Sequence, residues 1–104
     1  MARERMHETY AQRALRKIAH EGRTVAEIAA DAEAMVRRER INGRDYDSII
    51  AEMDRVAARK YDMIGRLNTK KAAERMAYLT GEQLVLDMVY HMFMLIGGRD
   101  DALA

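Results

Sequence analysis

The most constraining feature of the sequence is an apolar run near its carboxyl end, residues 84–96, which reads LVLDMVYHMFMLI. Only Asp87 and His91 in this run carry strongly polar side chains. On a helix the apolar side chains would cover all but a narrow strip, although a surface helix needs only one apolar stripe. The run is therefore predicted to form a helix that other helices surround. Its expected packing positions are Leu84, Met88, Val89, Met92, Phe93 and Ile96.

A chain of 104 residues has few elements with which to enclose such a helix. A second copy would double the supply of neighbours, so we expect a homodimer in which this helix is central. The chain has no proline and no cysteine, and 34% of its residues are charged. This composition is typical of a helical protein of the reducing cytoplasm. No apolar run is long enough to span a bilayer, so no membrane partner is expected.

Helical periodicity and capping residues divide the chain into further segments of one domain. The predicted segments are helices over 1–22, 24–41, 45–68, 70–79 and 81–97, followed by a loose tail over 98–104. Thr80 and Gln83 have the spacing of a capping box, which predicts that the last helix begins there. The apolar pattern of the long helix continues through Ile64 and Leu67. The fold class is therefore all-α, a dimeric bundle of four to five helices around a hydrophobic C-terminal helix.

Residues 24–29, TVAEIA, resemble the first helix of many helix-turn-helix domains, where a threonine cap and an Ile-Ala pair are common. Those domains then need a tight turn before a recognition helix, usually with a glycine four residues after the alanine. Here that position is Glu33, and the apolar stripe continues through Val36. The break that defines the motif is missing, so a continuous helix is favoured over a DNA-binding motif.

Glu4 and His7 have the Glu-x-x-His spacing of carboxylate-bridged di-iron bundles. Such a site needs a second motif of this kind and two more inward-facing glutamates. Neither His20 nor His91 has a glutamate three positions earlier, and the predicted core stripes over 24–41 and 45–68 contain no acid. We therefore predict no metal and no cofactor.

Asp87 and His91 are four residues apart and lie side by side on a helix. One interpretation is functional: an imidazole oriented by an acid for proton transfer, or half of a metal site. The other is a polar strip that faces solvent or sets the register of helix packing. No nucleophile can be placed beside the pair, so the structural interpretation is favoured and no residue is predicted to be catalytic.

Basic residues gather at two places along the chain. Those predicted to bind a partner, protein or nucleic acid, are Arg37, Arg38, Arg40 and Arg44 around one turn, and Lys70, Lys71 and Arg75 in the short helix. Interleaved acids favour ordinary solvated faces for most of them. Lys70 and Lys71 are an exception, because cations in the first turn oppose the helix dipole and favour an anionic partner.

Three classes of function remain. The sequence favours a non-enzymatic interaction protein, such as a small regulator, inhibitor or assembly subunit, that docks on a protein complex through charged helical faces. Compact, motif-poor chains of this type are common among phage and mobile-element products, including inhibitors of host defence, which is an analogy of type. The alternatives are a nucleic-acid-associated protein that contacts phosphates, and a small enzyme with an arginine-lined pocket between subunits. The net charge of +1 points neither to a strong polyanion binder nor to a nucleic-acid mimic.

Overall fold

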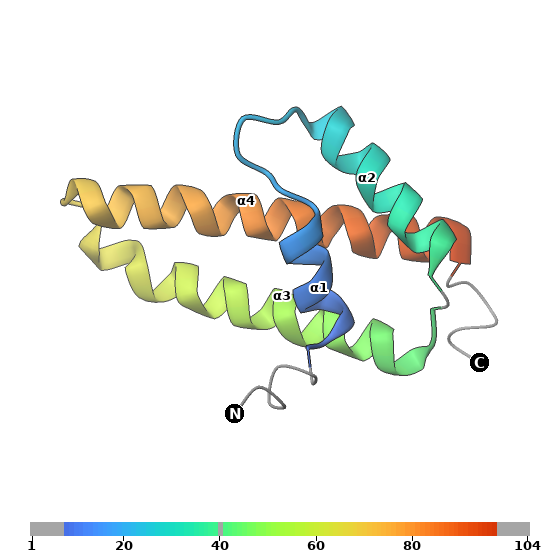
Figure 1. Ribbon diagram of the computed structural model, residues 1–104. Helices are drawn as coiled ribbons and strands as arrows, with labels where there is room; N and C mark the ends of the chain where they lie inside the picture. Colours follow the sequence, from blue (N-terminus) through green and yellow to red (C-terminus); the bar gives the residue numbers. More distant parts are fainter. Residues whose placement is uncertain (1–7, 40, 98–104) are drawn as a thin grey trace, which may run out of the picture.

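A computed structural model describes residues 8–39 and 41–97, which form helices and turns without a strand. The helices are α1 (Tyr10–Lys17), α2 (Val25–Arg38), α3 (Gly43–Met63) and α4 (Lys70–Met92), with a 3₁₀ turn η2 (Ile64–Arg66) and a final π-helical turn η3 (Phe93–Gly97). The long helices α3 and α4 form an antiparallel hairpin, while α1 and α2 pack on the half of it that lies away from its tip (Figure 1). The predicted all-α architecture and helix count are thus confirmed.

Side-chain caps determine where the helices begin. Thr9 and Thr24 each form a capping box with the residue three positions later, before α1 and α2 respectively. The side chain of Asn42 accepts a hydrogen bond from the backbone N–H of Asp45 at the start of α3, 2.9 Å away. Thr69 caps α4 in the same way through the N–H of Ala72, at 3.1 Å.

The bounds of α1 and α3 differ from the sequence-based prediction. α1 begins only at Tyr10, after the Thr9 cap, and ends at Lys17, whereas a helix was expected over 1–22. α3 begins at Gly43, two residues before the expected helix over 45–68, and its regular part ends at Met63, five residues before the expected end. The Glu4–His7 motif, Arg40 and the tail over 98–104 lie outside the described residues.

The helix break predicted at Thr80 is absent, because α4 runs unbroken from Lys70 to Met92. The Thr80 hydroxyl donates a hydrogen bond to the carbonyl of Met76 in the preceding turn, 2.9 Å away, and does not cap a new helix. Gly81 lies in the helix interior, directly beneath the ring of His20. The expected helices over 70–79 and 81–97 are therefore one element.

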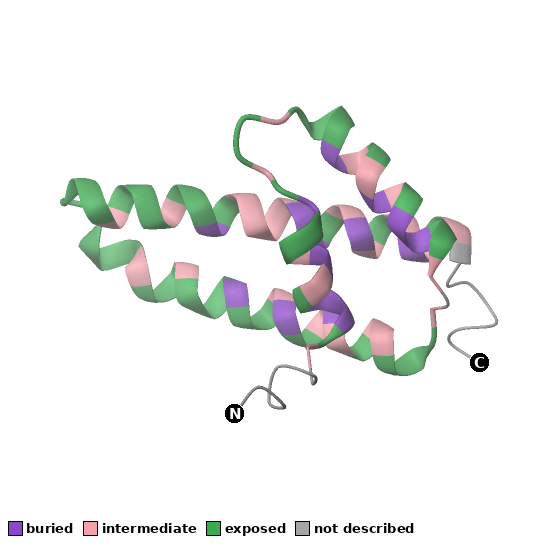
Figure 2. Cartoon of the chain, in the orientation of Figure 1, coloured by how far each residue is buried: buried purple, intermediate pink, exposed green. Residues whose placement is uncertain are grey.

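The core lies where α4 meets the other three helices. The buried residues of α4 and η3 are Leu79, Val85, Leu86, Val89 and Phe93, and they pack with residues such as Ile28, Met35, Ile49 and Val56 (Figure 2). Leu84, Met88, Met92 and Ile96 are half-buried against this cluster. A single chain thus supplies neighbours for most of the apolar carboxyl-terminal half of α4.

The α3–α4 hairpin extends beyond the cover of α1 and α2, and its far end is mostly exposed (Figure 2). Ile64 and Leu67, predicted core positions, are 59% and 43% exposed. The prediction was wrong for both residues, because two helices alone leave no third surface to cover the apolar stripe here.

Candidate interaction surface

The predicted partner-binding residues fall at two separate ends of the molecule. Arg37 and Arg38 close α2 and Arg44 opens α3, near the junction of these two helices (Figure 1). Lys70, Lys71 and Arg75 open α4 at the opposite end of the hairpin. The structure therefore does not unite the two clusters into one surface.

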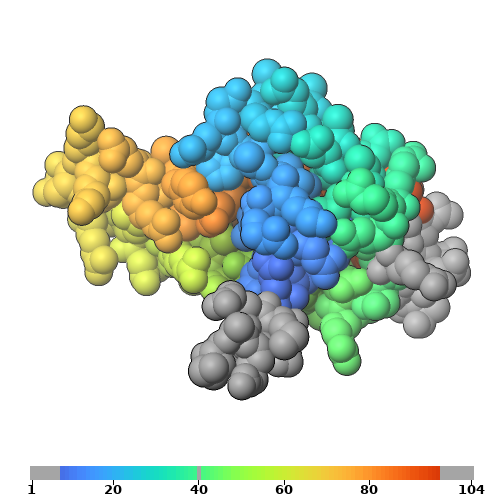
Figure 3. Space-filling view, viewed as in Figure 1, coloured from blue at the N-terminus to red at the C-terminus, as the bar shows by residue number. Residues whose placement is uncertain are grey.

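At the end with Lys70, the connection between α3 and α4 projects from the body of the molecule (yellow, Figure 3). We call residues 63–75 the hairpin tip. The tip contains an open, largely apolar groove of about 670 Å³ between η2 and the first turns of α4. The groove is lined by Met63, Gly65, Arg66, Asn68, Thr69, Lys71, Ala72 and Arg75.

The hairpin tip carries four cations, Arg66, Lys70, Lys71 and Arg75, and one acid, Glu74. None of these cations belongs to an ion pair formed among the described residues. Many cations in the body of the molecule do form ion pairs. For example, Nε of Arg37 lies 3.0 Å from the carboxylate of Glu33. The tip therefore presents a net positive charge, and its cations form no ion pair with the described residues.

Exposed apolar side chains accompany these cations. Ile64 and Leu67 lie on the tip, and Tyr61, in the turn before it, is 76% exposed. Tyr78, 42% exposed, lies one turn beyond the tip, where the guanidinium of Arg75 stands 5.7 Å from its ring centroid. Cations around a cluster of apolar side chains are typical of surfaces that bind a partner.

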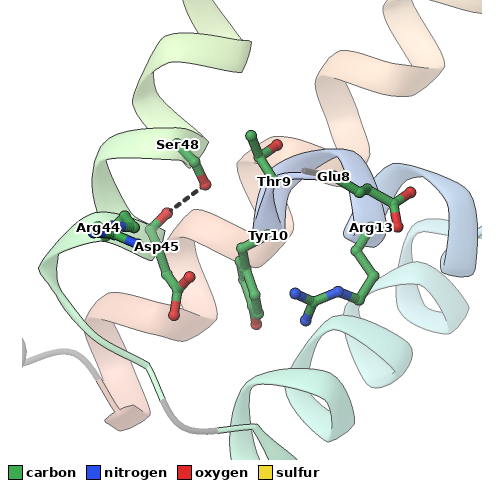
Figure 4. A pocket seen from close by; sticks show the side chains of 7 residues that line it. All are labelled: Glu8, Thr9, Tyr10, Arg13, Arg44, Asp45 and Ser48. Carbon is green, nitrogen blue, oxygen red and sulfur yellow. Dashed lines mark hydrogen bonds between the residues drawn. The ribbon is translucent and has the colours of Figure 1, made fainter. Parts of the chain in front are cut away.

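A second, smaller cavity of about 280 Å³ lies where α1 meets the start of α3 (Figure 4). Its lining residues are Glu8, Thr9, Tyr10, Arg13, Arg44, Asp45 and Ser48. The backbone N–H of Ala11 donates to the hydroxyl of Ser48, which in turn donates to the carbonyl of Asp45, over 3.3 and 2.9 Å. The hydroxyl of Ser48 is thus held by backbone groups and joins α1 to α3.

The charges around this cavity largely serve the fold. Arg13 donates to Glu39 of α2 at 2.6 Å, and Lys17 lies 3.8 Å from the same carboxylate. Burial raises the pKa of Tyr10 and, less strongly, that of Asp45. The phenol of Tyr10 therefore stays neutral, and the cavity is a junction of helices in which the hydroxyl of Ser48 forms hydrogen bonds with backbone groups.

Asp87 and His91 are both exposed on α4, so they form a strip that faces solvent. The predicted core stripe over 45–68 contains no acid, but the structure buries one acid of this segment. Glu52 of α3 is 6% exposed and pairs with Arg55 one turn later. Within residues 8–39 and 41–97, no three acid, histidine or cysteine side chains converge as a metal site would require.

The sequence predicts Lys70, Lys71 and Arg75 as partner-binding residues, but its apolar pattern places Ile64 and Leu67 in the core and it does not single out Arg66. A usable signal was present in part, because residues 63–73 contain three cations and no acid, a pattern that residues 9–20 share. No described helix is both long enough and apolar enough to cross a bilayer. Comparison with known proteins finds no match, since no family model, curated protein or solved structure resembles the chain.

Proposed function

We propose that this chain is a non-enzymatic interaction protein, a small regulator, inhibitor or assembly subunit, that docks on an acidic protein partner through its hairpin tip. The observation that supports this proposal is the apolar groove of the tip, flanked by Arg66, Lys71 and Arg75. A pocket for apolar side chains inside a polar rim is the arrangement found at energetic hot spots of protein interfaces.

The charge of the tip indicates the sign of the partner. Unpaired cations around a groove speed encounter with an acidic surface and disfavour basic ones. Lys70 and Lys71 strengthen this argument, because they stand in the first turn of α4, where cations oppose the helix dipole. An anionic partner relieves that repulsion when it binds.

A nucleic acid is the second candidate, supported by the same unpaired cations. A nucleic acid explains the cations of the tip but not its apolar side chains, because a phosphate backbone has no aliphatic groups to place in the groove or against Ile64 and Leu67. An enzymatic role has less support still, because the hydroxyl of Ser48 in the smaller cavity forms hydrogen bonds with backbone groups and not with a carboxylate or an imidazole. A protein partner is the function that uses the charged and the apolar parts together.

The homodimer stays a prediction. The sequence predicts it because one short chain has few elements to enclose the apolar helix, yet Val89 and Phe93 are already buried within a single chain. Leu95 is 58% exposed at the carboxyl end of the described chain and is the apolar residue there that a second copy could cover. Light scattering at micromolar concentration tests the dimer independently of partner binding.

The function is tested by a pull-down experiment in which the purified protein and three double variants serve as bait. Ile64→Ser with Leu67→Ser removes exposed apolar surface without changing charge, and Lys70→Glu with Lys71→Glu reverses the charge. Arg37→Glu with Arg38→Glu changes the same number of charges at the other end of the molecule and serves as the matched control. Circular dichroism verifies that each variant keeps its helices.

A captured protein counts only after its binding is measured with both components purified. The proposal expects an acidic partner that binds the wild type and the control equally and both tip variants at least about tenfold more weakly, or 1.4 kcal/mol. Binding lost in the control and kept in the tip variants would overturn the proposal. So would a captured complex that nuclease treatment dissolves.

A further inference from the structure

We infer that the groove of the hairpin tip receives a single amphipathic α-helix of the partner, with aliphatic anchors in the groove and carboxylates on both flanks. This inference rests on the proposed function and specifies the element that the tip recognises. It follows from the shape of the groove, from the elements that supply its cations and from the recognition modes that the fold does not offer.

The fold of the described residues limits how a segment can bind. Addition of a strand needs an exposed sheet edge, and residues 8–39 and 41–97 contain no strand. Recognition of a proline-rich helix needs an aromatic-lined groove, but the tip groove has no aromatic side chain in its lining. An apolar groove between helical elements matches the remaining mode, in which a helix places apolar residues at spacings of three and four into a groove.

The dimensions of the groove agree with one helix. A volume of about 670 Å³ lies within the range of about 300–1,000 Å³ of small-ligand pockets. Such a space accommodates a few apolar side chains of a partner. Met63 at its wall is a flexible side chain that adjusts to the shape of an anchor.

The cations stand on both sides of the groove. Lys71 and Arg75 are four residues apart on α4 and thus share a helix face, while Arg66 comes from η2 across the groove. A bound helix therefore meets positive charge along both edges of its apolar stripe. Glutamates on both sides of that stripe are the chemistry that fits. The tip of a second copy repeats the same cations and would be repelled.

The test uses a designed peptide of about 18 residues, or five helical turns. It places leucine at helical spacings of three and four and glutamate on either side of the leucine stripe. One control peptide replaces every glutamate by lysine, and another keeps the glutamates but has proline at its centre. The anisotropy of the labelled peptide is measured against the full chain at low and at high salt.

Two protein variants locate the binding. Ala72→Gln fills the groove with a good helix former and no charge, because Ala72 is a half-buried groove residue on α4. Ala51→Gln makes the same replacement at an exposed position in the middle of α3 and is the matched control. Both proteins should keep their helical circular dichroism and their thermal unfolding.

The inference expects the glutamate peptide to bind at least about tenfold more tightly than either control peptide, and more weakly as salt rises. Ala72→Gln should weaken binding at least about tenfold, and Ala51→Gln should leave it unchanged. Equal binding of the proline peptide, unchanged binding by Ala72→Gln, or no binding of the glutamate peptide at about 1 mM overturns the inference.

A failure here is distinguishable from failure of the proposed function. A purified partner whose binding depends on Ile64 and Leu67 keeps the function intact even if the glutamate peptide does not bind. A partner that binds equally well without those residues overturns the docking proposal itself. Tighter binding of a DNA duplex than of the glutamate peptide, lost in Lys70→Glu with Lys71→Glu, would move the tip to the nucleic-acid class and overturn both proposals.

Discussion

The imidazole ring of His20 lies so close to Gly81 that a Cβ added to this glycine would stand 2.2 Å from Nδ1 of the histidine. The same ring packs edge-on against Tyr78, with ring centroids 4.8 Å apart. The loop between α1 and α2 is thus fastened to the middle of α4 by an approach that only glycine permits.

Replacement of Gly81 by alanine should therefore destabilise the protein, against the trend for a helix interior. Alanine is favoured over glycine there by about 1 kcal/mol, but its methyl group displaces the whole His20 ring and breaks the contact with Tyr78. We expect a net loss of about 1 kcal/mol, measured by urea unfolding.

The control for this prediction removes the ring first. In a His20→Ala background the clash is gone, and Gly81→Ala should then stabilise the protein by about 1 kcal/mol through helix propensity alone. A stabilisation of equal size in the wild type and in the His20→Ala background would contradict the close approach.

Gly81 also illustrates what the sequence could and could not predict about the fold. The caps at Thr9 and Thr24 act through residues three positions away, and that information is local. A glycine after a threonine looks like a helix boundary from the sequence, but the residue that requires Gly81 is His20, sixty-one positions away. Periodicity identified the helices, but the contact that fastens the loop between α1 and α2 to α4 joins residues that are distant in the sequence.

The hairpin tip was predictable only in its charge. Lys70, Lys71 and Arg75 were identified because cations at a helix start conflict with the dipole. Ile64 and Leu67 continue the apolar stripe of α3, and a stripe does not reveal where its cover ends. That limit depends on the length of α1 and α2 relative to the hairpin, which is a property of the assembled fold.

The hydroxyl of Tyr10 provides a second test. Tyr10 is 3% exposed, and its hydroxyl has no hydrogen-bond partner among the described residues. A buried polar group without a partner costs about 1–3 kcal/mol, so Tyr10→Phe should leave stability unchanged or raise it by about 1 kcal/mol. Tyr10→Ala should instead cost about 3–5 kcal/mol, because it leaves a cavity. A marked loss of stability in Tyr10→Phe would mean that the hydroxyl does have a partner.

The carboxyl group of Asp45 predicts a dependence of stability on pH. Burial raises its pKa above the ordinary value of 3.8, so the folded chain binds this proton more readily than the unfolded chain. The contribution of Asp45 to stability is therefore fully present below the ordinary pKa and is lost as pH rises through the raised value. Asp45→Asn removes the ionisation and should raise the unfolding midpoint at pH 7, with a gain that shrinks as the pH falls below about 4.

Asp47→Asn is the matched control for this pH effect. Asp47 is an exposed residue near the same end of α3, so its replacement also removes a favourable interaction with the helix dipole. We expect Asp47→Asn to give no gain in stability at neutral pH. An equal change of stability in both variants across the pH range would contradict it.

The continuity of α4 predicts opposite effects for two threonines. Thr69 caps the helix through the N–H of Ala72, so Thr69→Ala should cost about 1 kcal/mol. Thr80 stands in the helix interior with its hydroxyl on the carbonyl of Met76, so Thr80→Ala should instead gain up to about 0.5 kcal/mol through helix propensity. Urea unfolding of both variants measures the difference. A loss of about 1 kcal/mol in Thr80→Ala would mean that a second helix begins there, in which case the hairpin tip would lie on a separate short helix. The unbroken helix α4 connects Lys70, Lys71 and Arg75 to the core. This comparison therefore also tests whether the hairpin tip and the core share one continuous helix.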